Sequence, residues 1–170
     1  MSEIDRDSII KTAELLGGHN IKINGADLSD LDLSGINLAG ANLNGCDMHN
    51  MKLEDTILRG AVMESVNLAN SDLERVDMSN ARLYRANMTN TDLRDSILVE
   101  AYLGSSNLQN ANFAGADLSK ARLQHADIRG ADFSKAKIIG ADIKYARYDE
   151  TTKWPDGVNP YLTGAVYYDR

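Results

Sequence analysis

Residues 26–45 read ADLSD LDLSG INLAG ANLNG when they are written in groups of five. The third position of each group is leucine, and the first position is small or apolar. An apolar third position continues through residues 21–145 in 25 consecutive groups, without an insertion or a deletion. A period of five matches neither an α-helix, at about 3.6 residues per turn, nor a β-strand, whose side chains alternate. It predicts a short unit that turns once per repeat, with two side chains pointing inward and three outward.

A fixed period of this kind is the mark of a solenoid, in which each unit buries its apolar side only against its neighbours. The groups follow the pattern A(D/N)LXX, as at residues 26–30 and 116–120, and this pattern resembles the pentapeptide repeat family over 125 of the 170 residues. The resemblance implies an all-β solenoid: a right-handed quadrilateral parallel β-helix with four groups per coil and about six coils. At a β-ladder spacing of about 4.8 Å per coil, the stack would be roughly 30 Å long.

Residues 1–20 precede the repeats and predict a short helix over residues 3–16. Ile9, Ile10, Ala13 and Leu16 share one side of that helix, and two glycines follow it as a stop signal. Because the open end of a solenoid has unpaired backbone groups and bare core, we expect the helix to cap the first coil. An amphipathic helix that binds a partner is the alternative.

Residues 146–170 form the third predicted segment, after the repeats of residues 21–145. They contain Trp154, four of the seven tyrosines and both prolines, so a regular helix or central strand is excluded around the prolines. We expect this aromatic tail to fold over the last coil as a cap. The alternative is a dimer surface, since some family members dimerise through their C-terminal ends, although usually with a helix that this tail lacks.

Inside the repeats, a coil of twenty residues predicts columns of stacked side chains. Phe113 and Phe133 should stack in successive coils, and Cys46 should be a buried, unreactive thiol. Thirteen of the 25 groups end in glycine or asparagine, which tolerate the positive φ that a type II turn requires. Four of these asparagines are spaced by twenty and should form an amide ladder: Asn50, Asn70, Asn90 and Asn110.

Composition and charge limit the classes of protein to which this chain can belong. The net charge is −7, which mainly favours solubility and only weakly indicates a basic partner. The one cysteine excludes a disulfide within the chain, and we find neither a signal-peptide pattern nor an apolar run that could span a membrane. We therefore expect a cytoplasmic protein that does not bind membranes.

The sequence contains no recognisable catalytic, cofactor-binding or metal-binding motif. No pair of the three histidines has metal-ligand spacing, and the glycines follow the turn rhythm instead of forming a phosphate loop. Stacked aspartates such as Asp72 and Asp92 resemble a cation site, but they occupy the ordinary D/N position of the repeat. A filled, convex prism should also lack the concave pocket that an active site needs. We expect no enzyme.

One face combines arginine and tyrosine, the residue types enriched at binding hot spots. Arginine also suits carboxylate or phosphate partners. The candidate interaction surface comprises Arg82, Tyr84, Arg85, Tyr102, Arg122, Gln124, His125, Lys144 and Tyr145. The competing interpretation is a solvated wall on which Tyr102 packs between two arginine stems.

The sequence favours an interaction scaffold with an unidentified protein partner, present as a monomer or as a dimer joined at the C-terminal ends. The alternative is a DNA mimic that binds an enzyme such as DNA gyrase, because family members that protect gyrase are acidic rods. The charge is uneven, however: residues 21–80 carry ten acidic and four basic side chains, whereas residues 81–145 carry seven and nine. A mimic of duplex phosphate should be negative along its whole length. We expect no direct binding to nucleic acid.

Overall fold

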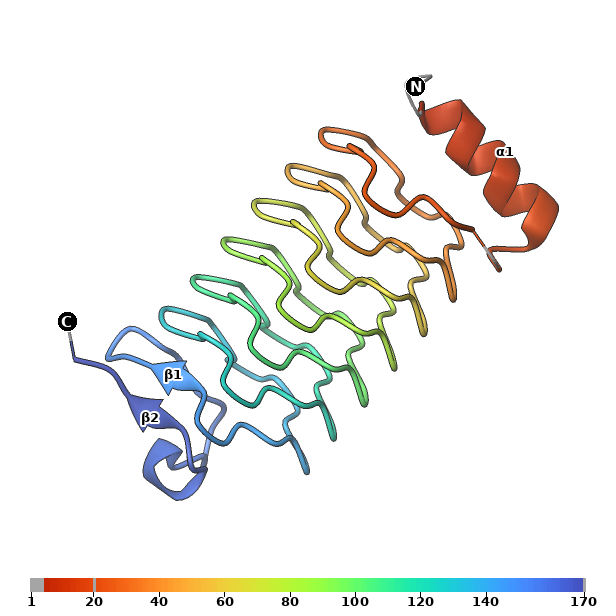
Figure 1. Ribbon diagram of the computed structural model, residues 1–170. Helices are drawn as coiled ribbons and strands as arrows, with labels where there is room; N and C mark the ends of the chain where they lie inside the picture. The colour runs from red at the N-terminus through yellow and green to blue at the C-terminus, as the bar shows by residue number, and fades with distance from the viewer. Residues whose placement is uncertain (1–4, 20, 170) are drawn as a thin grey trace.

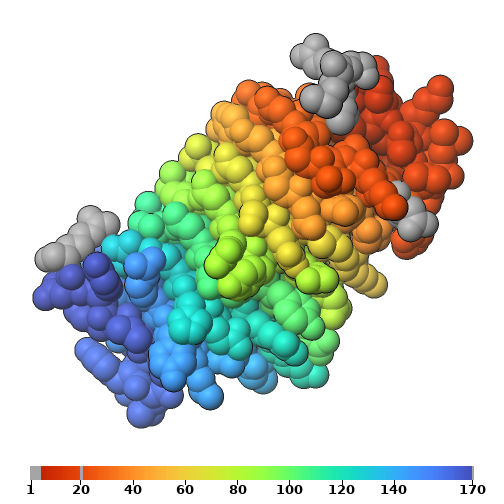
Figure 2. Space-filling view, viewed as in Figure 1, coloured from red at the N-terminus to blue at the C-terminus, as the bar shows by residue number. Residues whose placement is uncertain are grey.

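The computed structural model describes residues 5–19 and 21–169 as a stack of coils with a helix at one end (Figure 1). Its regular elements are helix α1 (Arg6–Leu16), strand β1 (Arg147–Tyr148), the 3₁₀ helix η1 (Pro160–Leu162) and strand β2 (Val166–Tyr167). In the space-filling view the coils follow one another as bands of colour between the two ends (Figure 2). The chain is therefore a β-helix solenoid, as the repeat pattern predicts.

Between α1 and β1 the coils consist of turns joined by parallel β-bridges. Each bridge connects a residue to the residue twenty positions later, from Lys22↔Asn42 to Asp127↔Arg147. A coil thus contains four groups of five, which places every fourth group on the same face. None of the described segments forms a helix with the length and apolar character needed to cross a bilayer.

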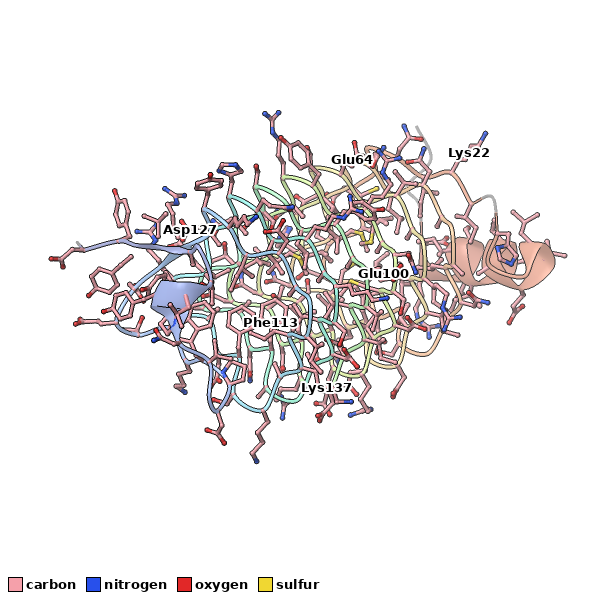
Figure 3. The ribbon with its side chains drawn as sticks, turned by 90° about the horizontal axis from the view of Figure 1, so that it is seen from below. Lys22, Glu64, Glu100, Phe113, Asp127 and Lys137 are labelled. Atoms are coloured by element: carbon pink, nitrogen blue, oxygen red, sulfur yellow. The ribbon has the colours of Figure 1, made fainter. Side chains whose placement is uncertain are left out.

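The interior is filled by the first and third side chains of each group. The rings of Phe113 and Phe133 stack with centroids 4.9 Å apart and planes 2° apart, which confirms the predicted pair. Figure 3 shows Phe113 inside the coils, whereas Lys22 and Glu64 lie on the same outer side of the molecule. Cys46 is 1% exposed and donates to the Ile23 carbonyl at 3.0 Å, as expected for a core thiol. Every buried side-chain nitrogen and oxygen among the described residues has a hydrogen-bond partner.

The turn at the end of each group has a left-handed backbone. All 25 final residues, from Gly25 to Tyr145, have positive φ, so the prediction that named thirteen glycines and asparagines was too narrow. For an arginine or a tyrosine this conformation costs roughly 1 kcal/mol or more. The fold offsets that cost because the amide of the final residue donates to the next coil, as Asp30 N does to His49 O at 3.1 Å. The hydrogen bonds between successive coils therefore outweigh the preference of each single residue for negative φ.

The asparagine ladder exists, with one change. Asn90 donates to Asn70 and Asn110 donates to Asn90, through side-chain amides at 3.1 and 3.2 Å. The predicted step between Asn50 and Asn70 is absent among the side-chain hydrogen bonds of the described residues, and Asn50 donates instead to the Asp30 carboxylate at 3.0 Å. This ladder stiffens one corner of the solenoid.

Helix α1 begins after Asp5, whose carboxylate accepts from the Ser8 amide at 2.8 Å. It ends at Leu16 and is capped by Gly17, which has φ 57°. Its predicted start at residue 3 lies outside the described residues. Ile9 and Ala13 are buried against the first coil, but Leu16 is 46% exposed, contrary to the prediction. Only the narrow stripe of Ile9 and Ala13, spaced by one turn, belongs to the core cluster.

The inter-coil hydrogen bonds continue beyond residue 145. Lys153 pairs with Asp132, and β2 lies parallel to β1 with Val166 opposite Arg147. The Trp154 ring stacks on Phe133 with centroids 6.0 Å apart, extending the aromatic column. Residues 152–154 and 164–168 thus supply the backbone contacts that a further coil would make.

Candidate functional site

The basic face is the set of outward side chains on the repeats centred at Ile23, Leu43, Met63, Leu83, Leu103, Leu123 and Ile143. It carries five basic residues and two acidic ones. The basic ones are Lys22, Arg82, Arg85, Arg122 and Lys144, and the acidic ones are Glu64 and Asp142. An acidic chain therefore presents one face with a net charge of +3. All nine residues of the candidate interaction surface lie on it.

Side chains on adjacent coils meet along a diagonal. The residue after one centre contacts the residue before the centre one coil later, eighteen positions on. Arg59 binds Asp77 in this way at 2.6 Å, and Gln124 donates to Asp142 at 2.8 Å. On the basic face the same diagonal joins Glu64 to Arg82 at 2.5 Å. The Arg82 guanidinium is thus already neutralised within the protein.

Arg85 and Arg122 behave differently from the other arginines. Among the described residues, they are the only arginines without a carboxylate within 4.0 Å. Each guanidinium lies over a tyrosine ring instead: Arg122 is 4.6 Å from the Tyr102 centroid, and Arg85 is 5.2 Å from that of Tyr84. A cation–π contact orients the guanidinium and leaves its N–H edge available to an anion.

A hollow of about 470 Å³ lies between these residues. Its lining consists of Glu64, Arg82, Tyr84, Tyr102, Gly104, Ser105, Arg122, Gln124 and His125. A second hollow, of about 230 Å³, lies on the far side of Tyr102 and Arg122, beside Glu100 and Lys120. The expectation that a convex prism has no concavity is therefore wrong, because the outward side chains differ in length from coil to coil.

Gly104 creates the larger hollow. It is the only glycine in residues 21–145 without a positive φ, so the turn does not require it. A Cβ at this position would lie 3.4 Å from the Tyr84 ring. Gly104 also occupies the diagonal position before Arg122, where other coils place a partner side chain. The missing side chain thus leaves Arg122 unpaired within the described chain.

The remaining predicted residues surround this centre. His125 lines the hollow, and its ring stacks on that of Tyr145 one coil further on, with centroids 5.1 Å apart. Lys144 and Tyr145 do not line the hollow, and Arg85 lies outside it beside Tyr84. The structure therefore brings together six of the nine predicted residues and places the other three at the margin.

Glu64 and Gly104 line the hollow but were not among the predicted residues. The diagonal spacing of eighteen would have found the first, since Glu64 precedes Arg82 by that distance. Gly104 could have been found as the single glycine directly after a repeat centre. Both features become visible only when a repeat is compared with the repeats of other coils.

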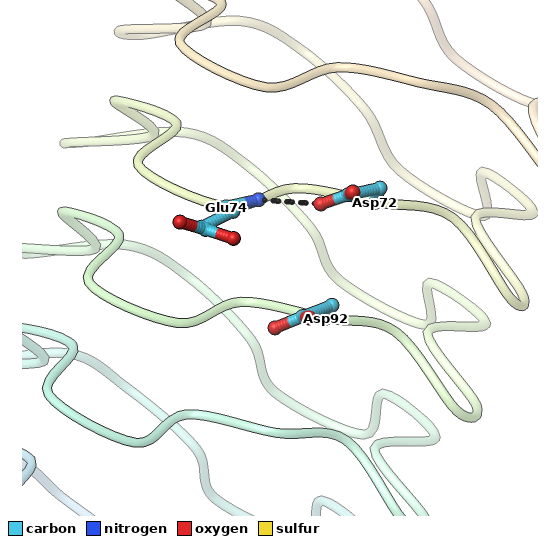
Figure 4. Close-up of side chains that lie close together, drawn as sticks. All are labelled: Asp72, Glu74 and Asp92. Carbon is cyan, nitrogen blue, oxygen red and sulfur yellow. Dashed lines mark hydrogen bonds between the residues drawn. The ribbon is translucent and has the colours of Figure 1, made fainter.

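Arginines bind two of the three carboxylates that lie together around the stacked aspartates, and the third, Asp72, accepts from the Glu74 amide at 3.1 Å. Asp72, Glu74 and Asp92 offer oxygens within 4.8 Å of one another (Figure 4). Arg94 binds Asp92 at 2.7 Å and Glu74 at 2.8 Å, and Arg75 also pairs with Glu74. The carboxylates of Glu74 and Asp92 therefore belong to a surface ion-pair network.

The pentapeptide repeat family model, with eight copies, matches residues 22–60, 61–98, 96–134 and 116–147. The chain belongs to the pentapeptide repeat family, which confirms the resemblance. A search of curated proteins found no significant match.

Two solved structures illustrate the likeness. HetL, a pentapeptide repeat protein involved in heterocyst differentiation regulation in the cyanobacterium Nostoc, is 22% identical, with a TM-score of 0.61 over 88% of this chain and 70% of HetL. QnrB1, a plasmid-mediated fluoroquinolone resistance protein, is 20% identical, with a TM-score of 0.59 over 87% of this chain and 82% of that one. At these identities the likeness concerns the fold.

Proposed function

We propose that the chain is a non-enzymatic interaction scaffold whose basic face binds an acidic segment of a protein partner. The observation that carries this proposal is the state of Arg85 and Arg122. Both lack a carboxylate partner among the described residues, and both are stacked on tyrosine rings of one face. A restrained guanidinium loses less conformational freedom on binding than a free one, which favours a bidentate contact to a carboxylate.

The surroundings support a contact surface. Tyr84 and Tyr102 are 44% and 39% exposed, and large exposed aromatic rings beside arginine are typical of binding hot spots. The proposal assigns no catalytic residue, metal or cofactor. It includes the right-handed helix of about six coils that the resemblance implies. It also includes two further expectations from the sequence, the caps formed by α1 and residues 146–170 and a location in the cytoplasm.

A DNA mimic is the weaker candidate. The positive charge of the basic face is opposite to that of a phosphate backbone, and a mimic requires negative charge along its length. We therefore place the acidic-segment scaffold first.

The test measures binding of a fluorescent peptide with alternating glutamate and glycine, against the same peptide with glutamine. We expect the glutamate peptide alone to bind, and the triple variant Arg82→Ala, Tyr102→Ala, Arg122→Ala to lose about tenfold or more in affinity. The matched control, Arg59→Ala with Lys137→Ala, also removes two cations, but from another face, and should bind normally. Equal binding by the triple variant, or none by the native protein, would reject the proposal.

A further inference from the structure

We infer that the hollow above Gly104 is the receptor for one carboxylate side chain of the acidic segment, and that Arg122 binds that carboxylate. The inference rests on the proposed function and goes further, because it names the bound group and its position.

Four diagonal pairs follow one another on this face. Glu64 and Arg82 form an ion pair, and Gln124 and Asp142 form a hydrogen bond. Between them, Tyr84 precedes Tyr102 and Gly104 precedes Arg122, both by eighteen residues. Only the pair of Gly104 and Arg122 lacks a side chain at its first position. A partner carboxylate in the hollow would take the place that Glu64 takes toward Arg82.

The position of the Arg122 side chain favours such a contact. A parallel β-bridge places Arg122 directly beside Tyr102 of the preceding coil, and the Arg122 guanidinium lies over the Tyr102 ring. Arg122 borders both the hollow above Gly104 and the smaller hollow beside Lys120. Tyr102 and Arg122 thus separate the two hollows. A partner peptide that lies across these two side chains could place neighbouring side chains in both hollows while its carboxylate contacts Arg122.

The charge of the hollow fits a monoanion. Its lining holds Arg82, Arg122 and Glu64, and the first and last of these three form the ion pair. With His125 of the lining counted as neutral, one formal positive charge remains, which a carboxylate neutralises. A phosphate group would bring a charge of about −1.5 to −2 and would face Glu64 in the same wall. A nucleic acid would in addition meet the acidic remainder of a chain with net charge −7.

The experiment places a carboxylate on the protein itself. Gly104→Glu should supply the diagonal partner of Arg122 and block the site, as Glu64 already neutralises Arg82. Because φ at position 104 is not positive and its side chain would point outward, the substitution should fold. Gly104→Gln has the same size without the charge and serves as the matched control. A thermal melt checks that both variants are folded.

Fluorescence anisotropy with the alternating glutamate–glycine peptide gives the readout. We expect Gly104→Glu and Arg122→Gln each to lose about tenfold or more in affinity, and Gly104→Gln to lose clearly less. Independently of any ligand, the Arg122 Nε–Hε resonance should shift in Gly104→Glu and remain near its native position in Gly104→Gln.

The possible outcomes separate the two proposals. If the peptide binds while Gly104→Glu and Arg122→Gln bind it normally, this inference is overturned and the scaffold proposal survives. If the native protein binds no glutamate peptide, both fail. Tighter binding of a matched phosphoserine peptide, or of a single-stranded oligonucleotide through Arg122, would overturn the assignment of a protein carboxylate.

Discussion

Asp127 shows how single residues fasten the solenoid near its C-terminal end. Its carboxylate accepts from Arg129 at 2.7 Å and from Arg147 at 2.9 Å, and Gln109 donates to it along the diagonal at 3.2 Å. Both guanidinium groups also lie near the Tyr168 ring, 4.9 and 5.8 Å from its centroid. A carboxylate that is 4% exposed is thus satisfied from three coils and covered by the tail.

We predict that Asp127→Asn lowers the free energy of unfolding by about 2 kcal/mol, because it leaves the largely buried Arg129 and the half-exposed Arg147 without their shared carboxylate. Urea unfolding of both proteins measures the change. Asp117→Asn is the control, since Lys137 lies 3.6 Å from a more exposed carboxylate there. That control should lose less than about 1 kcal/mol, and equal losses would contradict the prediction.

The same site gives a pH dependence. Burial raises the pKa of Asp127, but the hydrogen bonds from Arg129 and the charge of Arg147 outweigh it and hold that pKa below its ordinary value. The unfolded group titrates near about 3.9, so its stabilisation is present above that pH and is lost as the pH falls through the lower folded pKa. The stability difference between native protein and Asp127→Asn should therefore shrink below about pH 4.

At the scale of elements, the tail makes the same kinds of contact as a coil, although its sequence does not follow the repeat. Thr152 is buried, and its hydroxyl contacts the Ile128 carbonyl at 3.2 Å, as Thr56 does with Leu33 at 2.9 Å. Trp154 then takes the position of a repeat centre above Phe133. After η1 the chain returns, and the Val166 amide donates to Ala146 at 2.8 Å. These contacts support the proposal that the tail caps the last coil.

We predict that deletion of residues 149–170 lowers the melting temperature and promotes association, because it uncovers the Phe133 ring and the edge of the last coil. Light scattering and thermal melting measure both effects. Deletion of residues 169–170 keeps β2 and should leave both properties unchanged. A native dimer that becomes a stable monomer on truncation would instead show that the tail is a dimer surface.

At the scale of the whole molecule, charge is sorted by face. The basic face carries +3, whereas the face with the asparagine ladder has no charged outward side chain from Asn67 to Asn110. Ion pairs such as Arg59–Asp77 neutralise much of a third face. The fourth face, on the repeats centred at Leu33, Leu53, Leu73, Leu93, Phe113 and Phe133, carries eight acidic and four basic side chains. The acidic surplus is therefore gathered on one face, where Arg75 and Arg94 interrupt it through ion pairs.

We predict no inhibition of DNA gyrase supercoiling at micromolar protein, because that charge pattern does not copy a phosphate backbone. A gel assay of plasmid supercoiling measures it, with an established gyrase inhibitor as the positive control. Dose-dependent inhibition that disappears when Asp30, Asp32, Glu54 and Asp55 are neutralised would contradict the prediction and restore the DNA mimic as the first candidate.

The amino-acid sequence by itself determined the repeating part of this protein. A period of five specifies which side chains point inward, and the residues spaced by twenty, such as Phe113 and Phe133, identify the stacked columns. This was predictable because burial and turn geometry recur in every group and depend on the nearest residues. The sequence also drew attention to the arginines and tyrosines of the basic face.

Only the tertiary structure decided how those side chains are paired. Arg82 and Arg122 occupy the same repeat position, yet one is neutralised by Glu64 and the other faces the space above Gly104. The difference depends on the residue eighteen positions earlier on the preceding coil. That residue is a glutamate before Arg82 and a glycine, without a side chain, before Arg122. The path of the tail was likewise decided by hydrogen bonds to a finished coil, since residues 149–170 no longer follow the period that predicts the rest.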